Sequence, residues 1–188
     1  MHSTKGSKRE PPGKVRIIGG EHRGRKLDVA ERPGLRPTPD RVRETLFNWL
    51  GQRLDGKACL DLYAGTGALG FEAASRGASR VVMVEQDRAA FASLEHSKAL
   101  LSAGQVELHF GDALRYLAAG PERFDVVFLD PPFRQNALAA ALERLPARLA
   151  EGGRVYVESE APVEAGAGWR ELRRARAGQV SYQLLERS

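Results

Sequence analysis

Two short motifs combine residue types that could carry out a reaction. The segment 130–133, Asp-Pro-Pro-Phe, directly follows the apolar run 124–129 and places a carboxylate, a rigid turn and an aromatic ring at one point. Such a point suits a flat base that is held by its exocyclic amine. The segment 61–70, Asp-Leu-Tyr-Ala-Gly-Thr-Gly-Ala-Leu-Gly, follows another apolar strand and opens into a helical pattern, as the loop of a nucleotide-like cofactor site does. Together the two motifs predict methyl transfer to an amine.

The Asp-Pro-Pro-Phe motif fits the difficult part of that reaction. An exocyclic amine is a poor nucleophile because its nitrogen lone pair is delocalised into the ring, so the enzyme must localise it. We expect Asp130 and the carbonyl of Pro131 to accept hydrogen bonds from the two N–H groups of the amine. The successive prolines Pro131 and Pro132 fix the turn, and Phe133 stacks on the base. The proton is then lost to Asp130 or to water. Taken alone, Asp-Pro-Pro is also an ordinary loop after a strand.

The glycine motif has the form of a cofactor loop. Gly65, Gly67 and Gly70 satisfy G-x-G-x-x-G, and Glu85 stands twenty residues after Gly65, at the end of the next predicted strand, where an acid can bind ribose hydroxyls. This pattern alone fits NAD equally well. Asp61 favours a different ligand, because a carboxylate at the strand tip repels a pyrophosphate but suits a ligand with an ammonium and a sulfonium.

A third acid, Asp112, follows the next predicted strand and could accept a hydrogen bond from an adenine amino group. With the neighbours of these acids, the predicted cofactor-binding residues are Asp61, Tyr63, Ala64, Gly65, Gly67, Glu85, Gln86, Asp112, Ala113 and Asp130. Structural alternatives remain open for several of them. Asp61 could cap the following helix, Asp112 could be the N-cap of its own helix, and the glycines could only form a tight turn.

Composition is typical of a single α/β domain. The 188 residues are 42% hydrophobic and 28% charged, which allows a sizeable core. No apolar run approaches the roughly 20 residues that span a bilayer, and residues 1–14 lack the apolar stretch of a secretory signal, so we expect a cytoplasmic protein without a membrane contact. The single cysteine and four scattered histidines give no metal-ligand spacing, so no metal is expected.

Positive charge is concentrated near the N-terminus. Residues 1–57 hold 14 Lys and Arg against 7 Asp and Glu, whereas the rest of the chain holds 15 against 17. Such a basic segment on a near-neutral body indicates a polyanionic partner, although a solvated charged surface is the alternative. The expected RNA-binding residues are Arg16, Arg23, Arg25, Lys26, Arg36, Arg41 and Arg43. Their contacts would offset the cost of flipping out the target base, whose amine is otherwise sequestered by pairing.

The N-terminal third is predicted to form an RNA-binding extension over residues 14–57, after a disordered tail at 1–13. Strand-like runs at 15–18 and 25–29 flank a glycine-containing loop and predict a basic β-hairpin. The next element is a helix over about 39–50, with Thr38 as its N-cap and Pro39 at its first position.

The remainder, residues 58–188, is predicted to be the methyltransferase domain, because its pattern alternates between strands and helices and indicates a parallel, doubly wound sheet. Strands are expected at 58–62, 80–85, 106–110, 124–129 and 154–158, and helices at 68–76, 88–101, 113–117 and 136–149. The runs 169–175 and 179–185 alternate with period two, so we expect an antiparallel hairpin at the sheet edge.

From residue 14 to the C-terminus the chain resembles the RsmD family of bacterial 16S ribosomal RNA guanine-N2 methyltransferases. The matching stretches are 16–20, 23–27, 36–38, 40–50, 61–70 and 130–133. The last two are common to many amino-methyltransferases, whereas Arg-Pro-Thr at 36–38 and the stretch 40–47 are more specific. Departures are Tyr63, where the family often has Phe, Thr66, where it often has Ser, and Ser97, near which we would expect Asn; only the last puts a contact from the helix after Glu85 in doubt.

The resemblance implies a Rossmann-like class I methyltransferase fold and S-adenosylmethionine as methyl donor. It also implies that the acceptor is one guanine of 16S RNA, within the 30S subunit or an assembly intermediate. We expect the enzyme to be a monomer. Three other readings stay open: an amino-methyltransferase of DNA adenine or another RNA, an NAD-dependent dehydrogenase, and a ribosome-assembly factor without enzymatic activity. The dehydrogenase reading lacks a candidate His or Tyr-Lys catalytic pair.

Overall fold

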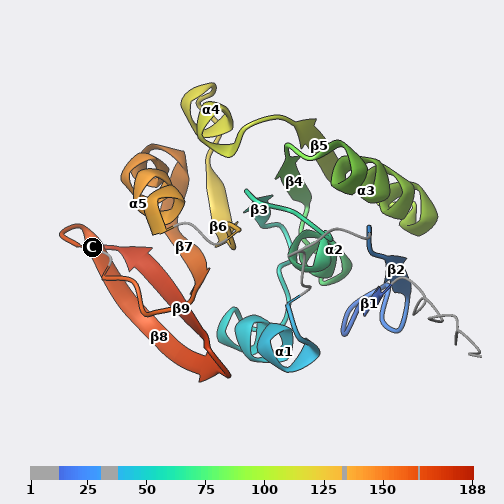
Figure 1. Cartoon of the computed structure of the whole chain (residues 1–188), viewed down its shortest axis with the longest axis horizontal. Helices are drawn as coiled ribbons and strands as arrows, with labels where there is room; N and C mark the ends of the chain where they lie inside the picture. Colours follow the sequence, from blue (N-terminus) through green and yellow to red (C-terminus); the bar gives the residue numbers. More distant parts are fainter. Residues whose placement is uncertain (1–12, 31–37, 133–134, 165) are drawn as a thin grey trace, which may run out of the picture.

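A seven-stranded sheet forms the centre of the molecule (Figure 1) in the computed structural model, which describes residues 13–30, 38–132, 135–164 and 166–188. The strand order is β5-β4-β3-β6-β7-β9-β8. The parallel strands are β3 (Ala58–Asp61), β4 (Arg80–Glu85), β5 (Val106–Phe110), β6 (Phe124–Leu129) and β7 (Leu149–Ser159). The C-terminal hairpin of β8 (Trp169–Ala177) and β9 (Val180–Arg187) joins β7 in antiparallel pairing. The predicted α/β sheet with its antiparallel addition is therefore confirmed.

Each face of the sheet carries its own hydrophobic cluster because successive strand side chains point to opposite sides. On one face pack α1 (Asp40–Trp49), α2 (Ala68–Ser75) and α3 (Arg88–Leu101). On the other face pack α4 (Ala113–Ala118) and α5 (Gln135–Arg144). We call these the α2 face and the α5 face.

The N-terminal hairpin is confirmed as a separate two-stranded antiparallel sheet of β1 (Lys14–Arg16) and β2 (Lys26–Asp28). It packs on the α2 face, where Ile17 and Leu27 are fully buried in the hydrophobic cluster. Gly20 has φ +78°, and a Cβ added there would lie 1.9 Å from the carbonyl oxygen of Ser75. The hairpin loop can approach the end of α2 so closely only because this residue is glycine.

A buried charge network joins the hairpin, α1 and α2. Glu72 is fully buried; its Oε1 accepts hydrogen bonds from the Gly19 amide and Arg76 Nε, and its Oε2 accepts from the Ile18 amide and Arg43 Nη1. Arg43 is only 1% exposed. Its assignment to the RNA-binding residues is therefore wrong, because its guanidinium donates hydrogen bonds to Glu72 and to neighbouring groups inside the protein.

The start of α1 differs from its prediction. The helix begins at Asp40, and its N-cap is Pro39, whose carbonyl accepts the Arg43 amide at 3.1 Å, without any side-chain cap. Thr38 is thus not the N-cap. Its hydroxyl instead donates a 3.4 Å hydrogen bond to Glu158 on β7, 120 residues away in the chain. A contact of this kind cannot be read from local spacing.

The helix expected at 136–149 is also shorter than predicted. It ends at Arg144 and is followed by a 3₁₀ helix, Leu145–Arg148, after which β7 already starts at Leu149 instead of residue 154. Pro146 explains the change, since it has no amide hydrogen and cannot continue an α-helix. The elements at 80–85, 88–101, 106–110 and 124–129 match their predicted bounds.

Some predictions lie outside the described residues: the tail as far as residue 12, the RNA contact of Arg36 and the stacking of Phe133. Within the described ranges, no helix is long and apolar enough to cross a membrane.

Candidate active site

Three carboxylates form a row at the carboxyl end of the sheet, on the α2 face. Asp61 ends β3, Asp130 follows β6, and Glu158 is the penultimate residue of β7. Their strands are neighbours in the order β3-β6-β7. Leu129 and Val157, which directly precede Asp130 and Glu158, belong to the cluster on the α5 face. Because successive side chains of a strand point to opposite sides, Asp130 and Glu158 point to the α2 face. We call Asp61, Asp130 and Glu158 the acid row.

Asp61 is hydrogen-bonded to the start of the helix that follows the glycine loop. The residue is 2% exposed, and its Oδ2 accepts a 2.9 Å hydrogen bond from the amide of Gly70 in the first turn of α2. The predicted alternative, that Asp61 caps this helix, is therefore realised. Burial raises the pKa of Asp61 to about 7; the Gly70 amide lowers it, and the charge of Glu85 raises it further.

The glycine loop itself is shaped by two residues with positive φ. Gly65 has φ 55° and Gly67 has φ 81°. A Cβ on Gly67 would lie 2.6 Å from the ring of Phe71 and 2.7 Å from Leu94, so a larger residue would push the loop away from α2 and α3. These glycines do form a tight turn, as the structural alternative proposed, and the turn also leaves backbone open for close approach of a ligand.

Glu85 is tied to the same loop. One carboxylate oxygen accepts the Gly65 amide at 2.8 Å, and the other accepts the amides of Gln86 and Asp87 at 3.1 and 2.9 Å. The end of β4 and the glycine loop are thereby fixed to each other. The Gln86 side chain is exposed beside this junction.

The remaining predicted cofactor residues surround the same end of the sheet. Asp112 is the N-cap of α4, because its Oδ1 accepts the Arg115 amide at 2.9 Å, as the structural alternative proposed. Asp112 also interacts with Tyr63. Burial raises the pKa of the Tyr63 phenol, and the negative charge of Asp112 raises it further. Ala64 and Ala113 are buried.

Asp130 and Glu158 lie side by side. In the register of β6 and β7, Leu129 is opposite Val157, so the next residue on each strand is Asp130 and Glu158. Burial raises the pKa of Asp130 well above its usual range, and the charges of Glu158 and Asp61 add to this, whereas a hydrogen bond from Thr38 opposes it. Within the Asp-Pro-Pro turn, Pro131 is buried and Pro132 is exposed.

Glu158 was not predicted as a functional residue. Its Oε2 accepts hydrogen bonds from the Tyr156 hydroxyl at 3.0 Å and from the Thr38 hydroxyl at 3.4 Å. A usable sequence signal was present, because an acid ends the predicted strand at 154–158 just as Asp61 and Glu85 end theirs.

The acid row is largely buried, and burial raises the pKa of each of its three carboxyl groups. No Lys or Arg contributes to the pKa shifts of Asp61, Asp130 or Glu158. The same residue ranges contain no group of three His, Cys, Asp or Glu side chains arranged to hold a metal ion. The oxygens of three neighbouring carboxyl groups can accept hydrogen bonds from N–H donors.

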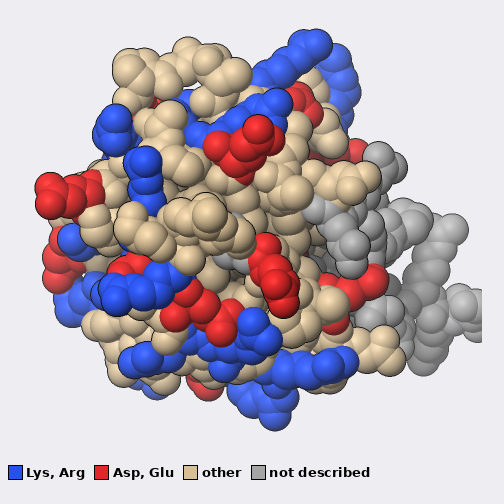
Figure 2. Space-filling model, turned by 90° about the vertical axis from the view of Figure 1, so that its left-hand side faces the viewer, with Lys and Arg blue, Asp and Glu red and all other residues tan. Residues whose placement is uncertain are grey.

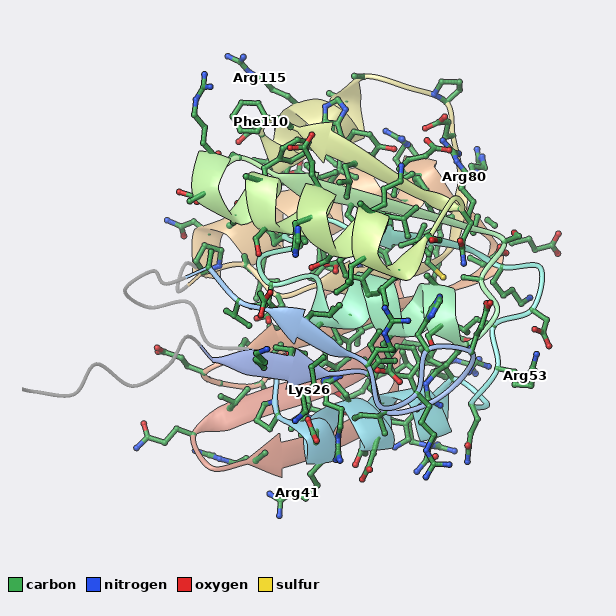
Figure 3. All side chains as sticks on the ribbon, turned by 90° about the vertical axis from the view of Figure 1, so that its right-hand side faces the viewer. Lys26, Arg41, Arg53, Arg80, Phe110 and Arg115 are labelled. Carbon is green, nitrogen blue, oxygen red and sulfur yellow. The ribbon has the colours of Figure 1, made fainter. Side chains whose placement is uncertain are left out.

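The predicted RNA-binding residues of the hairpin are exposed. They are Arg16, Arg23, Arg25 and Lys26, and Arg41 is exposed on α1. Figure 3 shows Lys26 on the hairpin and the side chain of Arg41 directed into solvent from α1. Two of the arginines also make protein contacts, Arg16 with Asp40 at 3.1 Å and Arg25 with the carbonyl of Leu100 at 3.0 Å.

The side of the molecule with α5 and the C-terminal hairpin has a different charge pattern. Figure 2 shows Lys and Arg interspersed there with Asp and Glu. On the hairpin, Arg170 pairs with Glu186 and Arg174 pairs with Glu171.

The strand order, with helices on both faces of the sheet, is that of a class I, Rossmann-like methyltransferase fold. The acid row lies at the carboxyl ends of its strands. Comparison with known proteins agrees. The family model described as Conserved hypothetical protein 95 matches residues 15–186. Ribosomal RNA small subunit methyltransferase D of Escherichia coli K12 is 46% identical over 93% of this chain and 91% of its own, and that of Haemophilus influenzae is 42% identical over 93% and 94%. The solved structure of the yhhF protein of E. coli has a TM-score of 0.86, with 42% identity over 93% of this chain and 98% of its own.

The chain therefore belongs to the Conserved hypothetical protein 95 family and, among its relatives, to the RsmD methyltransferases. The resemblance drawn from the motifs is confirmed.

Proposed function

We propose that the protein transfers a methyl group from S-adenosylmethionine to the exocyclic N2 amine of one guanine in 16S ribosomal RNA. One observation carries the proposal: Asp61 under the glycine loop and Asp130 of the Asp-Pro-Pro turn lie on one face of two paired strands, and the charge of Asp61 acts on Asp130. A donor held at the loop would therefore lie beside a carboxylate suited to an amine. The names of the similar proteins support small-subunit ribosomal RNA as the substrate.

The residues around the glycine loop fit a positively charged donor. Asp61, Glu85 and Asp112 bring three carboxylates to the ends of neighbouring strands. S-adenosylmethionine supplies an electrophilic methyl group when it is bound there. We assign its binding to Asp61, Tyr63, Ala64, Gly65, Gly67, Glu85, Gln86, Asp112, Ala113 and Asp130. Within this set, Glu85 would bind the ribose hydroxyls and Asp112 the adenine amino group.

The Asp-Pro-Pro-Phe motif holds the amine in this proposal. Asp130 and the carbonyl of Pro131 accept its two N–H bonds, Pro132 fixes the turn, and Phe133 stacks on the base. Positioning of this kind can lower a barrier by roughly 7 to 11 kcal/mol, so no strong general base is required.

The exposed cations of the N-terminal hairpin and α1 grip the RNA in this proposal. We assign this role to Arg16, Arg23, Arg25, Lys26, Arg36 and Arg41. Residues 14–57 then act as an RNA-binding extension of the methyltransferase domain at 58–188. Contacts to the flanking backbone would offset the few kcal/mol that it costs to flip the guanine out of its stack.

We further propose that the monomeric enzyme acts in the cytoplasm on the 30S subunit or one of its assembly intermediates. The test uses S-adenosylmethionine with a tritiated methyl group and three acceptors: unmodified 30S subunits, free 16S RNA and duplex DNA. The labelled RNA is digested to nucleosides, which are identified by chromatography and mass spectrometry, and the modified position is mapped. We expect N2-methylguanosine from 30S subunits or 16S RNA. Label in DNA alone, or in N6-methyladenosine, would overturn the proposal.

A further inference from the structure

Glu158 occupies the position in the acid row from which a second contact to the base can be made. It is adjacent to Asp130 across the β6–β7 pair, and both side chains point to the α2 face. Neighbouring strands lie about 4.8 Å apart. Two carboxylates at this spacing can accept hydrogen bonds from two neighbouring N–H donors on one edge of a base.

The Glu158 side chain is held in place on one of its oxygens only. The hydroxyls of Tyr156 and Thr38 both donate to Oε2, and Tyr156 is itself fully buried between Phe128 and Tyr182. Among the described residues, Oε1 accepts no hydrogen bond, and Glu158 as a whole is partly exposed. The carboxylate is thus positioned through Oε2 and can offer Oε1 to a ligand.

Guanine offers two neighbouring donors on its Watson–Crick edge, the N1–H and the N2 amine, whereas adenine offers one donor and, at N1, an acceptor. We propose that Glu158 accepts the guanine N1–H while Asp130 accepts the N2 amine, so that Glu158 determines specificity for guanine. This inference rests on the proposed function and adds to it the residue that selects the base.

The proposal explains how the site rejects adenine. Facing adenine, the Glu158 carboxylate would meet the N1 lone pair, and a buried acceptor opposite an acceptor leaves both groups without a hydrogen bond. It also gives Thr38 a role as a positioning residue, because its hydroxyl orients Glu158 and does not touch the base.

The test uses 2-aminopurine, which keeps the N2 amine of guanine but has a lone pair at N1. A 16S RNA is ligated with 2-aminopurine at the position mapped above, and its methylation is compared with that of the guanine RNA under single-turnover conditions. We expect the wild-type enzyme to methylate guanine at least about 100-fold faster. Comparable rates for the two bases would overturn the inference without the use of any variant.

The variant Glu158→Gln then isolates the contact. The amide oxygen can still accept from Tyr156, and the amide NH₂ can donate to N1 of 2-aminopurine. We expect the preference for guanine over 2-aminopurine to fall at least about tenfold. Because the same two substrates are compared in both enzymes, differences in the intrinsic reactivity of the two amines cancel.

Glu160→Gln is the matched control, since Glu160 is exposed just beyond the end of β7, and its preference should equal that of the wild type. An unchanged preference in an active Glu158→Gln enzyme would show that Glu158 does not face N1. If the wild type forms N2-methylguanosine but does not discriminate, only this inference fails. If it forms no N2-methylguanosine, the proposed function fails as well.

Discussion

Arg43 on α1 and Glu72 on α2 form a 3.2 Å ion pair in which the side chains are 1% and 0% exposed. The same guanidinium bonds Asp40 and the carbonyls of Arg16 and Thr38, so one arginine joins the hairpin, α1 and α2. A buried pair of this kind is expensive to break, because removal of one partner leaves the other charge without compensation.

Arg43→Ala should therefore destabilise the protein by about 3 kcal/mol, measured as the free energy of urea unfolding. Arg41→Ala on the exposed side of the same helix is the control and should change stability by less than about 0.5 kcal/mol. Equal effects of the two substitutions would contradict the structural role of Arg43.

Asp130→Ala should lower the single-turnover rate of methyl transfer at least about 100-fold, because a hydrogen-bond acceptor of the amine is lost. Binding of S-adenosylmethionine, followed by calorimetry, should change much less, since the glycine loop is held by Asp61 and Glu85. Glu151→Gln, on the exposed start of β7, is the control and should leave both quantities unchanged. Wild-type turnover in Asp130→Ala would remove this residue from the proposed chemistry.

Methyl transfer should slow as the pH falls, because the reaction needs ionised Asp130 and the pKa of this carboxyl is raised by burial, Glu158 and Asp61. The side chains that interact with it are Asp61 from β3, Tyr156 and Glu158 from β7, and Thr38 before α1. Tyr182 from β9 contacts Tyr156. Glu158→Gln removes one of these negative charges, so the acidic limb of the pH–rate profile should move to lower pH. A limb that stays in place in an active variant would contradict the coupling.

Asp61 should make stability depend on pH. Burial raises its folded pKa to about 7, so the folded state binds a proton that the unfolded state has already released above about pH 4. Its contribution to stability is complete at low pH and is lost as the pH rises through 7. The free energy of unfolding of Asp61→Asn, measured with urea and compared with that of the wild type at the same pH, should therefore increase by about 2 to 4 kcal/mol from pH 4 to pH 8. A constant difference across this range would show that Asp61 titrates normally.

The N-terminal hairpin should account for much of the salt dependence of RNA binding. Replacing Arg16, Arg23 and Arg25 together by Glu should weaken the affinity for 16S RNA. The slope of the logarithm of the binding constant against the logarithm of the salt concentration should become less steep by roughly 0.7 to 0.9 for each lost phosphate contact. Donor affinity should not change.

The same charge change on the other side provides the control for that experiment. Arg144, Arg173 and Arg176 are exposed on α5 and β8, and their replacement by Glu should weaken RNA binding far less. Similar losses for both triple variants would contradict the assignment of the hairpin as the RNA-binding surface.

Much of the sheet could be predicted because strands such as 80–85 and 124–129 are short apolar runs with turns on both sides, and burial of their side chains agrees with that pattern. The glycine loop and the Asp-Pro-Pro turn were found for a similar reason, since each is a contiguous motif at a strand end. The two motifs lie close together because the carboxyl ends of parallel strands share an edge of the sheet.

Contacts between distant segments could not be predicted. Helical spacing places Arg43 on the side of Leu46 and Phe47, whereas Arg41 lies on the polar side of the helix. It does not identify Glu72, the buried partner 29 residues away. Thr38 has the residue type of an N-cap, but its hydroxyl contacts Glu158. In both cases a local rule failed because the tertiary partner lies far along the chain.

The helix α2 begins at the glycine loop and ends against the N-terminal hairpin. Gly20 touches the carbonyl of Ser75 at its last turn, Glu72 receives the Ile18 and Gly19 amides, and Asp61 receives the Gly70 amide at its first turn. A truncated enzyme that starts near residue 58 would thus keep every motif of the donor site and still lose three of the four groups that donate to the buried Glu72 carboxylate. The first third of the protein is part of the foundation of the methyltransferase, and a minimal catalytic fragment would have to include it.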